Sequence, residues 1–139
     1  MTGWSMRRPP SFDEELARWT LGEAPELHAL RAALQKVVAE RLTDAADRQD
    51  LTERLTIVAT ELAGNALRHG RPPAVVMLQR SDGKLVIDVL DTGRESTPAV
   101  DDRRPVGGLG LVLAQRLAKE VGWYPTEGGK RVWATFEMA

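Results

Sequence analysis

The order of patterns in this chain predicts an α+β protein, a two-layer sandwich with helices packed on one face of a mixed, mostly antiparallel sheet. Apolar residues recur at helical spacing over residues 25–42 and 50–69. Two β-rich runs are joined by Asp82-Gly83, and a second hairpin closes the chain around Gly128-Gly129. With 139 residues, the chain is long enough to bury one core.

The first residues differ in character from the rest. Residues 1–12 are polar and contain Pro9 and Pro10, so we expect a flexible tail followed by a single domain over residues 13–139. A short strand around Arg18 is indicated by Leu16, Trp19 and Leu21.

Two helices are expected next. Pro25 suits the first turn of a helix, and this first helix, which carries His28 as a surface residue, is expected to be structural. The second begins at Asp50, where an Asp cap is followed three residues later by Glu53. It ends near His69, because Gly70 and the prolines that follow stop a helix.

The second half of the chain returns to strands. Residues 75–78 and 84–90 form an antiparallel pair around the Asp-Gly turn. Residues 92–106 show no periodicity, which is typical of a lid or binding loop. A third helix opens at the glycines of residues 107–110. Its apolar stripe comprises Leu109, Leu113, Leu117 and Val121. Strands at Trp123-Tyr124 and 131–136 then form the closing hairpin.

Composition excludes several classes of protein. The 19 basic and 20 acidic side chains give a formal charge of −1, so neither nucleic acid nor an anionic membrane is an expected partner. Cys is absent, which rules out disulfides and Cys-based zinc sites. No uncharged run approaches the ~20 residues of a membrane span, and no signal peptide is present, so a cytoplasmic location is expected.

One polar pair interrupts the apolar second helix. Glu61 and Asn65 lie four residues apart and therefore share a helix face. The pair borders a buried stripe of Leu51, Leu55, Val58 and Leu62. A carboxylate and a carboxamide in that position can hold a metal and a water over a nucleotide. The alternative is the solvated edge of an ordinary amphipathic helix.

Two further motifs have a chemical interpretation. Asp91 ends a strand, where a fixed acceptor could receive a hydrogen bond from an exocyclic amine such as that of adenine; it could equally begin a turn with Thr92-Gly93. Gly107-Gly108-Leu109-Gly110 opens a helix and would let a phosphate approach the backbone closely. The cluster could also be a hinge, and it matches neither of the two commonest phosphate loops.

Together these motifs resemble a known superfamily. Glu61-x-x-x-Asn65-Ala66, Asp91-x-Gly93 and Gly108-x-Gly110-Leu111 are similar to the N, G1 and G2 boxes of the GHKL ATPase/kinase superfamily, which has the Bergerat fold. Within it, the segments 61–70, 107–123 and 128–136 look like the small anti-sigma-factor serine kinases and their actinobacterial relatives. The resemblance covers roughly residues 18–136.

This resemblance implies ATP and Mg²⁺ as cofactors. It implies that Asn65 coordinates Mg²⁺, that Asp91 binds the adenine amine and that Glu61 is the general base. The remaining residues that it places around the nucleotide are Gly93, Gly108, Leu109, Gly110 and Leu111.

The implied function is a protein serine/threonine kinase that phosphorylates an anti-anti-sigma factor of the STAS type and sequesters a sigma factor, regulating transcription by partner switching. Glu61 separates it from sensor histidine kinases, which commonly have Asn there, and so disfavours a detached histidine-kinase domain. A homodimer is a family-based expectation. The sequence departs from the family pattern at Glu95 and at Lys130-Arg131. Lys130 or Arg131 could meet a phosphate, but we expect both to face solvent. These departures favour an alternative, a binding module with weak or no catalytic activity.

Overall fold

The structure, a computed structural model, describes residues 6–9, 14–42, 47–69, 72–91 and 112–138. Its strands are β1 (Glu14–Leu21), β2 (Ala74–Ser81), β3 (Lys84–Asp91), β4 (Glu120–Thr126) and β5 (Gly129–Glu137). Its two long helices are α1 (Glu26–Arg41) and α2 (Arg48–His69). A shorter helical segment covers residues 112–117.

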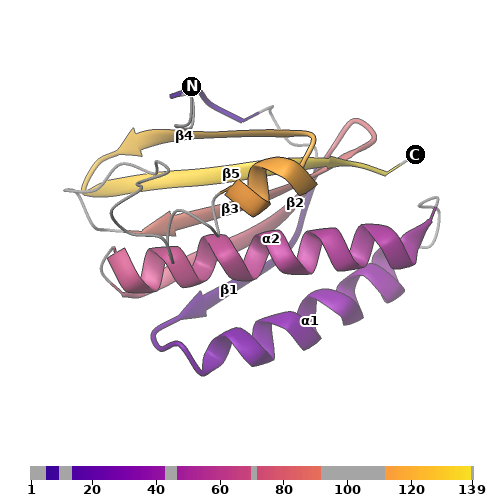
Figure 1. Cartoon of the computed structure of the whole chain (residues 1–139), viewed down its shortest axis with the longest axis horizontal. Coiled ribbons are helices and arrows are strands. Elements are labelled where there is room, and N and C mark those ends of the chain that lie inside the picture. The colour runs from indigo at the N-terminus through magenta and orange to yellow at the C-terminus, as the bar shows by residue number, and fades with distance from the viewer. Residues whose placement is uncertain (1–5, 10–13, 43–46, 70–71, 92–111, 139) are drawn as a thin grey trace.

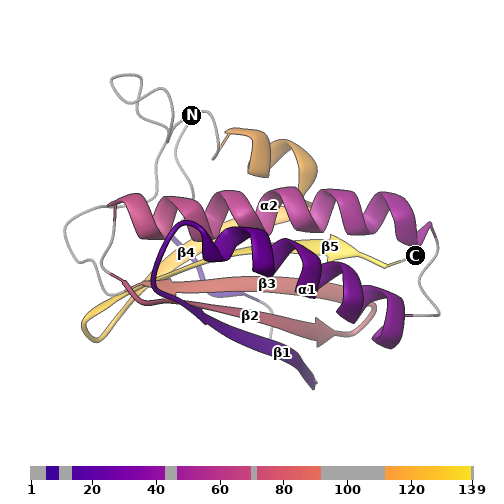
Figure 2. The same cartoon turned by 90° about the horizontal axis from the view of Figure 1, so that it is seen from below.

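The strands form one sheet in the order β1-β2-β3-β5-β4. All neighbouring strands in it are antiparallel. Figures 1 and 2 show α1, α2 and the segment 112–117 on the same face of this sheet. The predicted α+β sandwich, with helices on one face of a mostly antiparallel sheet, is therefore confirmed. The one parallel contact in the described part of the chain is a bridge between Met6 and Trp123.

The buried stripes of the two long helices hold the layers together. In α2, Leu51, Leu55, Val58 and Leu62 are all buried, as the sequence predicts. In α1 the buried residues are Leu30, Leu34 and Val38. Before α1, the Glu26 carboxylate accepts hydrogen bonds from the backbone N–H groups of Gly22 and Glu23, at 2.9 and 3.0 Å. This carboxylate satisfies amides in the turn from β1 into α1.

Side chains along β3 alternate between the two faces of the sheet. Leu85, Ile87 and Val89 belong to the core under the helices. Asp91 is the next position in this series, so its side chain is on the helix-covered face. Asp88 is on the opposite face.

Both predicted hairpin turns are present. In the first, Asp82 and Gly83 have φ of 41° and 78°, the positive values that a tight Asp-Gly hairpin needs. In the second, Gly128 has φ of 85° and Thr126 pairs with Gly129. Two-residue turns of this kind match the twist of the flanking strands, which sets the register of each pair.

One helical prediction was wrong. Val121, expected on the stripe of the third helix, lies in β4 and pairs with Ala134 of β5. The described helix ends at residue 117, and the backbone N–H of Lys119 already donates to the Thr135 carbonyl at 2.8 Å. Pairing with β5 therefore overrides the helical periodicity at this position. The predicted loop 92–106 and the helix start at 107–110 lie outside the described residues.

Residues 6–9, which we assigned to the tail, contact β4 and β5. The Arg7 backbone N–H donates to the Trp123 carbonyl, and the Trp133 indole N–H donates to the Arg7 carbonyl, both at 2.8 Å.

Among the helices that the structure describes, none has the length and apolar character needed to cross a membrane.

Candidate functional site

The elements that carry the predicted polar residues are in contact across the two layers of the sandwich. Figures 1 and 2 show the C-terminal end of α2, the end of β3 and the start of β5 at the same end of the molecule. Helix α2 packs directly on β3 and β5. Glu61 and Asn65 of α2 and Asp91 of β3 thus come from two layers that are in contact.

Glu61 and Asn65 lie at the margin of the buried face of α2. Both are partly buried, whereas their neighbours Leu62 and Ala66 are 2% and 6% exposed. A side chain in this position can reach a bound molecule while its helix stays anchored in the core. Arg68, one turn beyond Gly64, is exposed.

Asp91 is held by an ion pair that the sequence analysis missed. Its carboxylate is 1% exposed, and its Oδ2 lies 3.2 Å from Nζ of Lys130. The two residues are direct partners in the β3–β5 register, so their side chains emerge on the same face. The expectation that Lys130 faces solvent was wrong, because Lys130 is only 5% exposed.

A second ion pair lies on the opposite face of the same two strands. Arg131 Nη1 is 3.1 Å from Asp88 Oδ1 and donates a hydrogen bond to it. Burial raises the pKa of Asp88 above its ordinary value, and the Arg131 charge opposes that rise. Arg131 was also expected to face solvent, but it is partly buried against Asp88 because a buried carboxylate needs a counter-charge.

The positions of the charged residues along the sequence are consistent with both ion pairs once the strand order is known. Asp88 and Asp91 are on alternate faces of β3, and the adjacent Lys130 and Arg131 are on alternate faces of β5. Once β3 and β5 are known to be neighbours, each acid has a base on its own face. Asp91 and Lys130 are separated by 38 residues in the sequence, so the pairing is not visible locally.

The described residues can be tested against a bound Mg²⁺. Among them, no group of three His, Cys, Asp or Glu side chains could hold a metal ion. Mg²⁺ in nucleotide sites is bound by one or two protein oxygens, with waters and phosphates supplying the rest. The carboxamide oxygen of Asn65 is a hard ligand suited to that arrangement. The other predicted pocket residues, Gly93, Gly108, Leu109, Gly110 and Leu111, lie outside the described residues.

The sequence matches a known family over most of its length. The profile of the histidine kinase-like ATPase domain matches residues 23–136. The chain belongs to this family, and the predicted membership of the GHKL superfamily is confirmed at that level. No curated protein has a significantly similar sequence.

Two solved structures are similar in fold. One contains the RsbU and RsbW domains of Rv1364c from Mycobacterium tuberculosis and is 21% identical in sequence, with a TM-score of 0.63. The match covers 88% of this chain and 32% of the Mycobacterium chain. The second is the Acinetobacter baumannii histidine kinase AdeS, 15% identical, with a TM-score of 0.50 over 88% of this chain and 68% of the other. This chain thus spans about a third of the solved Mycobacterium chain.

Proposed function

We propose that this protein binds Mg²⁺–ATP between α2 and the adjoining ends of β3 and β5, and transfers the γ-phosphoryl group to a partner protein. The observation that supports the proposal is the packing of α2, which carries Glu61 and Asn65, directly on β3, which carries the buried Asp91, in a chain of the ATPase family. Glu61 and Asn65 are partly buried at the margin of the core, where polar side chains are costly to desolvate without a partner.

Each described residue has a separate role in this proposal. Asn65 would hold the Mg²⁺ ion through its carboxamide oxygen, and the ion would neutralise phosphate charge. Asp91 accepts a hydrogen bond from the adenine amine. Glu61, four residues before Asn65 on the same helix face, is the general base.

The reaction is a phosphoryl transfer to a serine or threonine hydroxyl. The hydroxyl oxygen bonds to the γ-phosphorus, the bond from that phosphorus to the β–γ bridging oxygen breaks, and ADP leaves with the electron pair. Glu61 accepts the hydroxyl proton. Because phosphoryl transfer depends mainly on positioning and charge, a base aligned by a rigid helix is sufficient.

We infer that the partner is a STAS-type anti-anti-sigma factor and that phosphorylation controls a sigma factor by partner switching. The sequence resemblance to anti-sigma-factor kinases supports this partner class. The likeness in fold to a structure that contains an RsbW domain is consistent with it.

The test is a phosphotransfer assay with labelled ATP and the STAS-domain proteins of the same organism. We expect label on a Ser or Thr of one of them, and a loss of about 100-fold or more in Glu61→Gln with ATP binding retained. Glu53→Gln, the same change at an exposed position of α2, is the control and should leave transfer unchanged. Full activity in Glu61→Gln would remove Glu61 as the base.

A second function, a binding module without catalysis, is favoured by one observation. Lys130 already contacts the Asp91 carboxylate and could compete with the base of a nucleotide. ATP binding without transfer to any STAS-domain protein, or no ATP binding at all, would support this alternative.

A further inference from the structure

Residues 6–9 lie beside β4 and over the outer face of β5, the face of the sheet opposite the helices (Figure 1). The Arg7 backbone N–H donates to the Trp123 carbonyl, as in a pair of parallel strands. The next bond in that register would come from the N–H of residue 125, which is a proline and has none. The Arg7 carbonyl instead accepts a hydrogen bond from the Trp133 indole at 2.8 Å. A strand edge and an aromatic side chain together thus hold this short segment.

The side chain of Arg7 is surrounded by groups that suit a guanidinium. Its Nη1 lies 3.4 Å from Glu120 Oε2, and its Nη2 donates to the Val121 carbonyl at 3.3 Å. The guanidinium carbon is 5.3 Å from the centroid of the Trp133 ring, within the range of a cation–π contact. A Cβ at residue 122 would be 3.0 Å from Arg7 Cγ, so Gly122 leaves room for the aliphatic part of the side chain. A carboxylate, a carbonyl and an aromatic ring are the partners that arginine uses in recognition.

Arg8 is held by the next outward-facing residue of β4. Its guanidinium carbon is 4.8 Å from the centroid of the Tyr124 ring. Tyr124 is two residues beyond Gly122, so both are on the outer face. Two consecutive arginines thus find partners on what we term the β4–β5 surface, made up of Glu120, Val121, Gly122, Tyr124 and Trp133.

The contacts on the β4–β5 surface are shallow. The side chains of Arg7 and Glu120 are 48% and 35% exposed, and Met6 is 65% exposed. Ion pairs and ring contacts with this exposure each contribute little. The covalent link to the rest of the chain adds a local concentration of the order of millimolar. An outside segment with the same chemistry can therefore displace residues 6–9.

We propose that the β4–β5 surface is a docking site for an extended segment of a partner protein that carries two consecutive arginines, and that residues 6–9 are its intramolecular competitor. The Glu120 carboxylate and the rings of Trp133 and Tyr124 recognise the arginines. The edge of β4 supplies a backbone hydrogen bond, as in β-strand addition. The surface is on the face of the sheet opposite α2, so docking there is independent of the proposed nucleotide site.

The experiment measures the binding of a capped, fluorescein-labelled peptide with the sequence of residues 5–10, Ser-Met-Arg-Arg-Pro-Pro, by fluorescence anisotropy. The proteins are the full-length wild type and the full-length double variant Arg7→Ala/Arg8→Ala, whose own segment has lost both guanidinium groups. We expect the double variant to bind the peptide about 10-fold more tightly than the wild type, because its internal competitor is weakened. A peptide that itself carries Arg7→Ala and Arg8→Ala should bind neither protein measurably.

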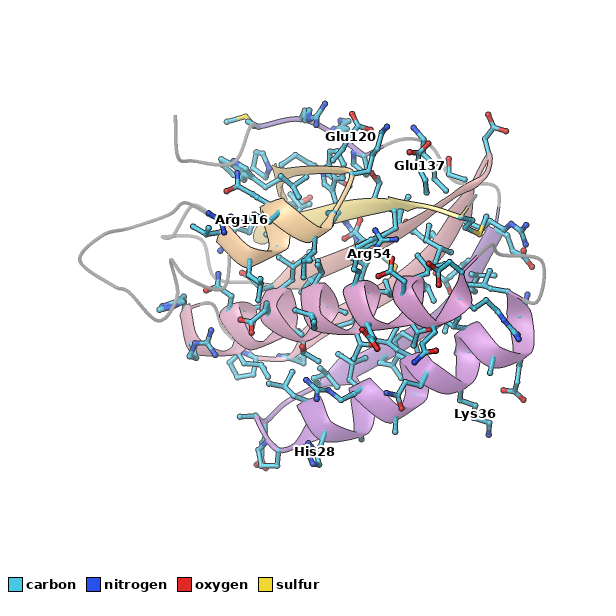
Figure 3. The ribbon with its side chains drawn as sticks, turned by 45° about the vertical axis from the view of Figure 1, so that its right-hand side comes forward. His28, Lys36, Arg54, Arg116, Glu120 and Glu137 are labelled. Carbon is cyan, nitrogen blue, oxygen red and sulfur yellow. The ribbon has the colours of Figure 1, made fainter. Side chains whose placement is uncertain are left out.

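Two matched changes, each added to the double variant, test where the peptide binds. Figure 3 shows Glu120 and Glu137 on the side of the sheet away from α1 and α2, and each pairs with a lysine. Glu120 also contacts Arg7, whereas Glu137 pairs with Lys119. Glu120→Gln should weaken peptide binding about fivefold, the value of one exposed ion pair, and Glu137→Gln should leave it unchanged.

Should the double variant fail to fold, Arg8→Ala alone keeps the contacts of Arg7 and is expected to bind the peptide about threefold more tightly than the wild type. No peptide binding by a folded variant at millimolar peptide would overturn the inference and show that residues 6–9 are a fixed part of the fold. Equal affinities of the variant and the wild type, or equal effects of the two Gln changes, would place the peptide elsewhere and overturn it as well. None of these outcomes depends on ATP, so they leave the proposed function untouched.

Discussion

Gly122 of β4 and Trp133 of β5 are register partners, and the indole lies where a side chain at residue 122 would stand. A Cβ at residue 122 would be 2.5 Å from Trp133 Cζ2. The guanidinium of Arg7 lies 5.3 Å from the centroid of the same ring. Trp133 is thus packed between the backbone of β4 and residues 6–9, on the face of the sheet opposite the helices.

Gly122→Ala is therefore expected to destabilise the protein by about 1–3 kcal/mol, the usual cost of overpacking a buried contact. Gly22→Ala is the control, because a Cβ there would meet only Glu26 Oε1 at an ordinary 3.6 Å. Urea unfolding of both variants measures the effect. A wild-type midpoint in Gly122→Ala would show that Trp133 moves aside without cost.

The Asp88–Arg131 pair gives a pH-dependent prediction. The pKa of Asp88 in the folded protein is raised above the ordinary value of 3.8 that applies when the chain is unfolded. The folded state therefore binds the proton more tightly. This contribution to stability is fully present below pH 3.8 and is lost as the pH rises through the raised pKa. Removing Arg131 raises the pKa further. Arg131→Met should cost about 3 kcal/mol near pH 7, where Asp88 would be a buried unpaired charge, and less near pH 4, where Asp88 takes up a proton.

The control for this prediction is the same change in an Asp88→Asn background. With no charge to leave unpaired, Arg131→Met should then cost less than about 1 kcal/mol at either pH. Equal losses at both pH values in the Asp88 protein would contradict the assignment. Guanidinium chloride unfolding at the two pH values provides the free energies.

Arg54 connects α2 to the end of the helical segment 112–117 (Figure 3). Its Nη1 donates to the Leu117 carbonyl at 3.3 Å, and its Nε donates to Asp50 at 2.8 Å. Arg54→Ala leaves a helix-terminal carbonyl without this donor. We expect a loss of about 1 kcal/mol and faster hydrogen exchange at the Ala118 amide, which bonds to the Ala114 carbonyl.

Asp50→Ala separates the two contacts of Arg54. It removes a solvent-exposed pair within one helix and should cost no more than about 0.5 kcal/mol, with exchange at Ala118 unchanged. If the two variants are equally destabilised, the contact with the Leu117 carbonyl contributes nothing measurable.

Local rules predict much of this fold. The stripe of Leu51, Leu55, Val58 and Leu62 identifies α2 and its buried face, because helical periodicity depends only on neighbours along the chain. Asp82-Gly83 identifies the first hairpin for the same reason. The polar pair Glu61 and Asn65 is placed at the margin of that face by spacing alone.

Features that depend on pairing between distant segments could not be predicted. Val121 fits a helical stripe, and only its partner Ala134 shows that it belongs to a strand. The neutralisation of Asp91 by Lys130 requires the β3–β5 register, as does that of Asp88 by Arg131. The packing of Arg7 on Trp133 joins residues 126 positions apart. Loop-closing contacts of this kind leave no local periodicity.

The most direct test of the central claim is a calorimetric titration with ATP, with and without Mg²⁺, of the wild type and of Asn65→Ala. Glu53→Ala, at an exposed position of the same helix, is the control. The proposed site requires magnesium-dependent ATP binding in the wild type and in the control, and its loss in Asn65→Ala. No binding by the wild type at millimolar ATP, or equal binding by Asn65→Ala, would contradict it.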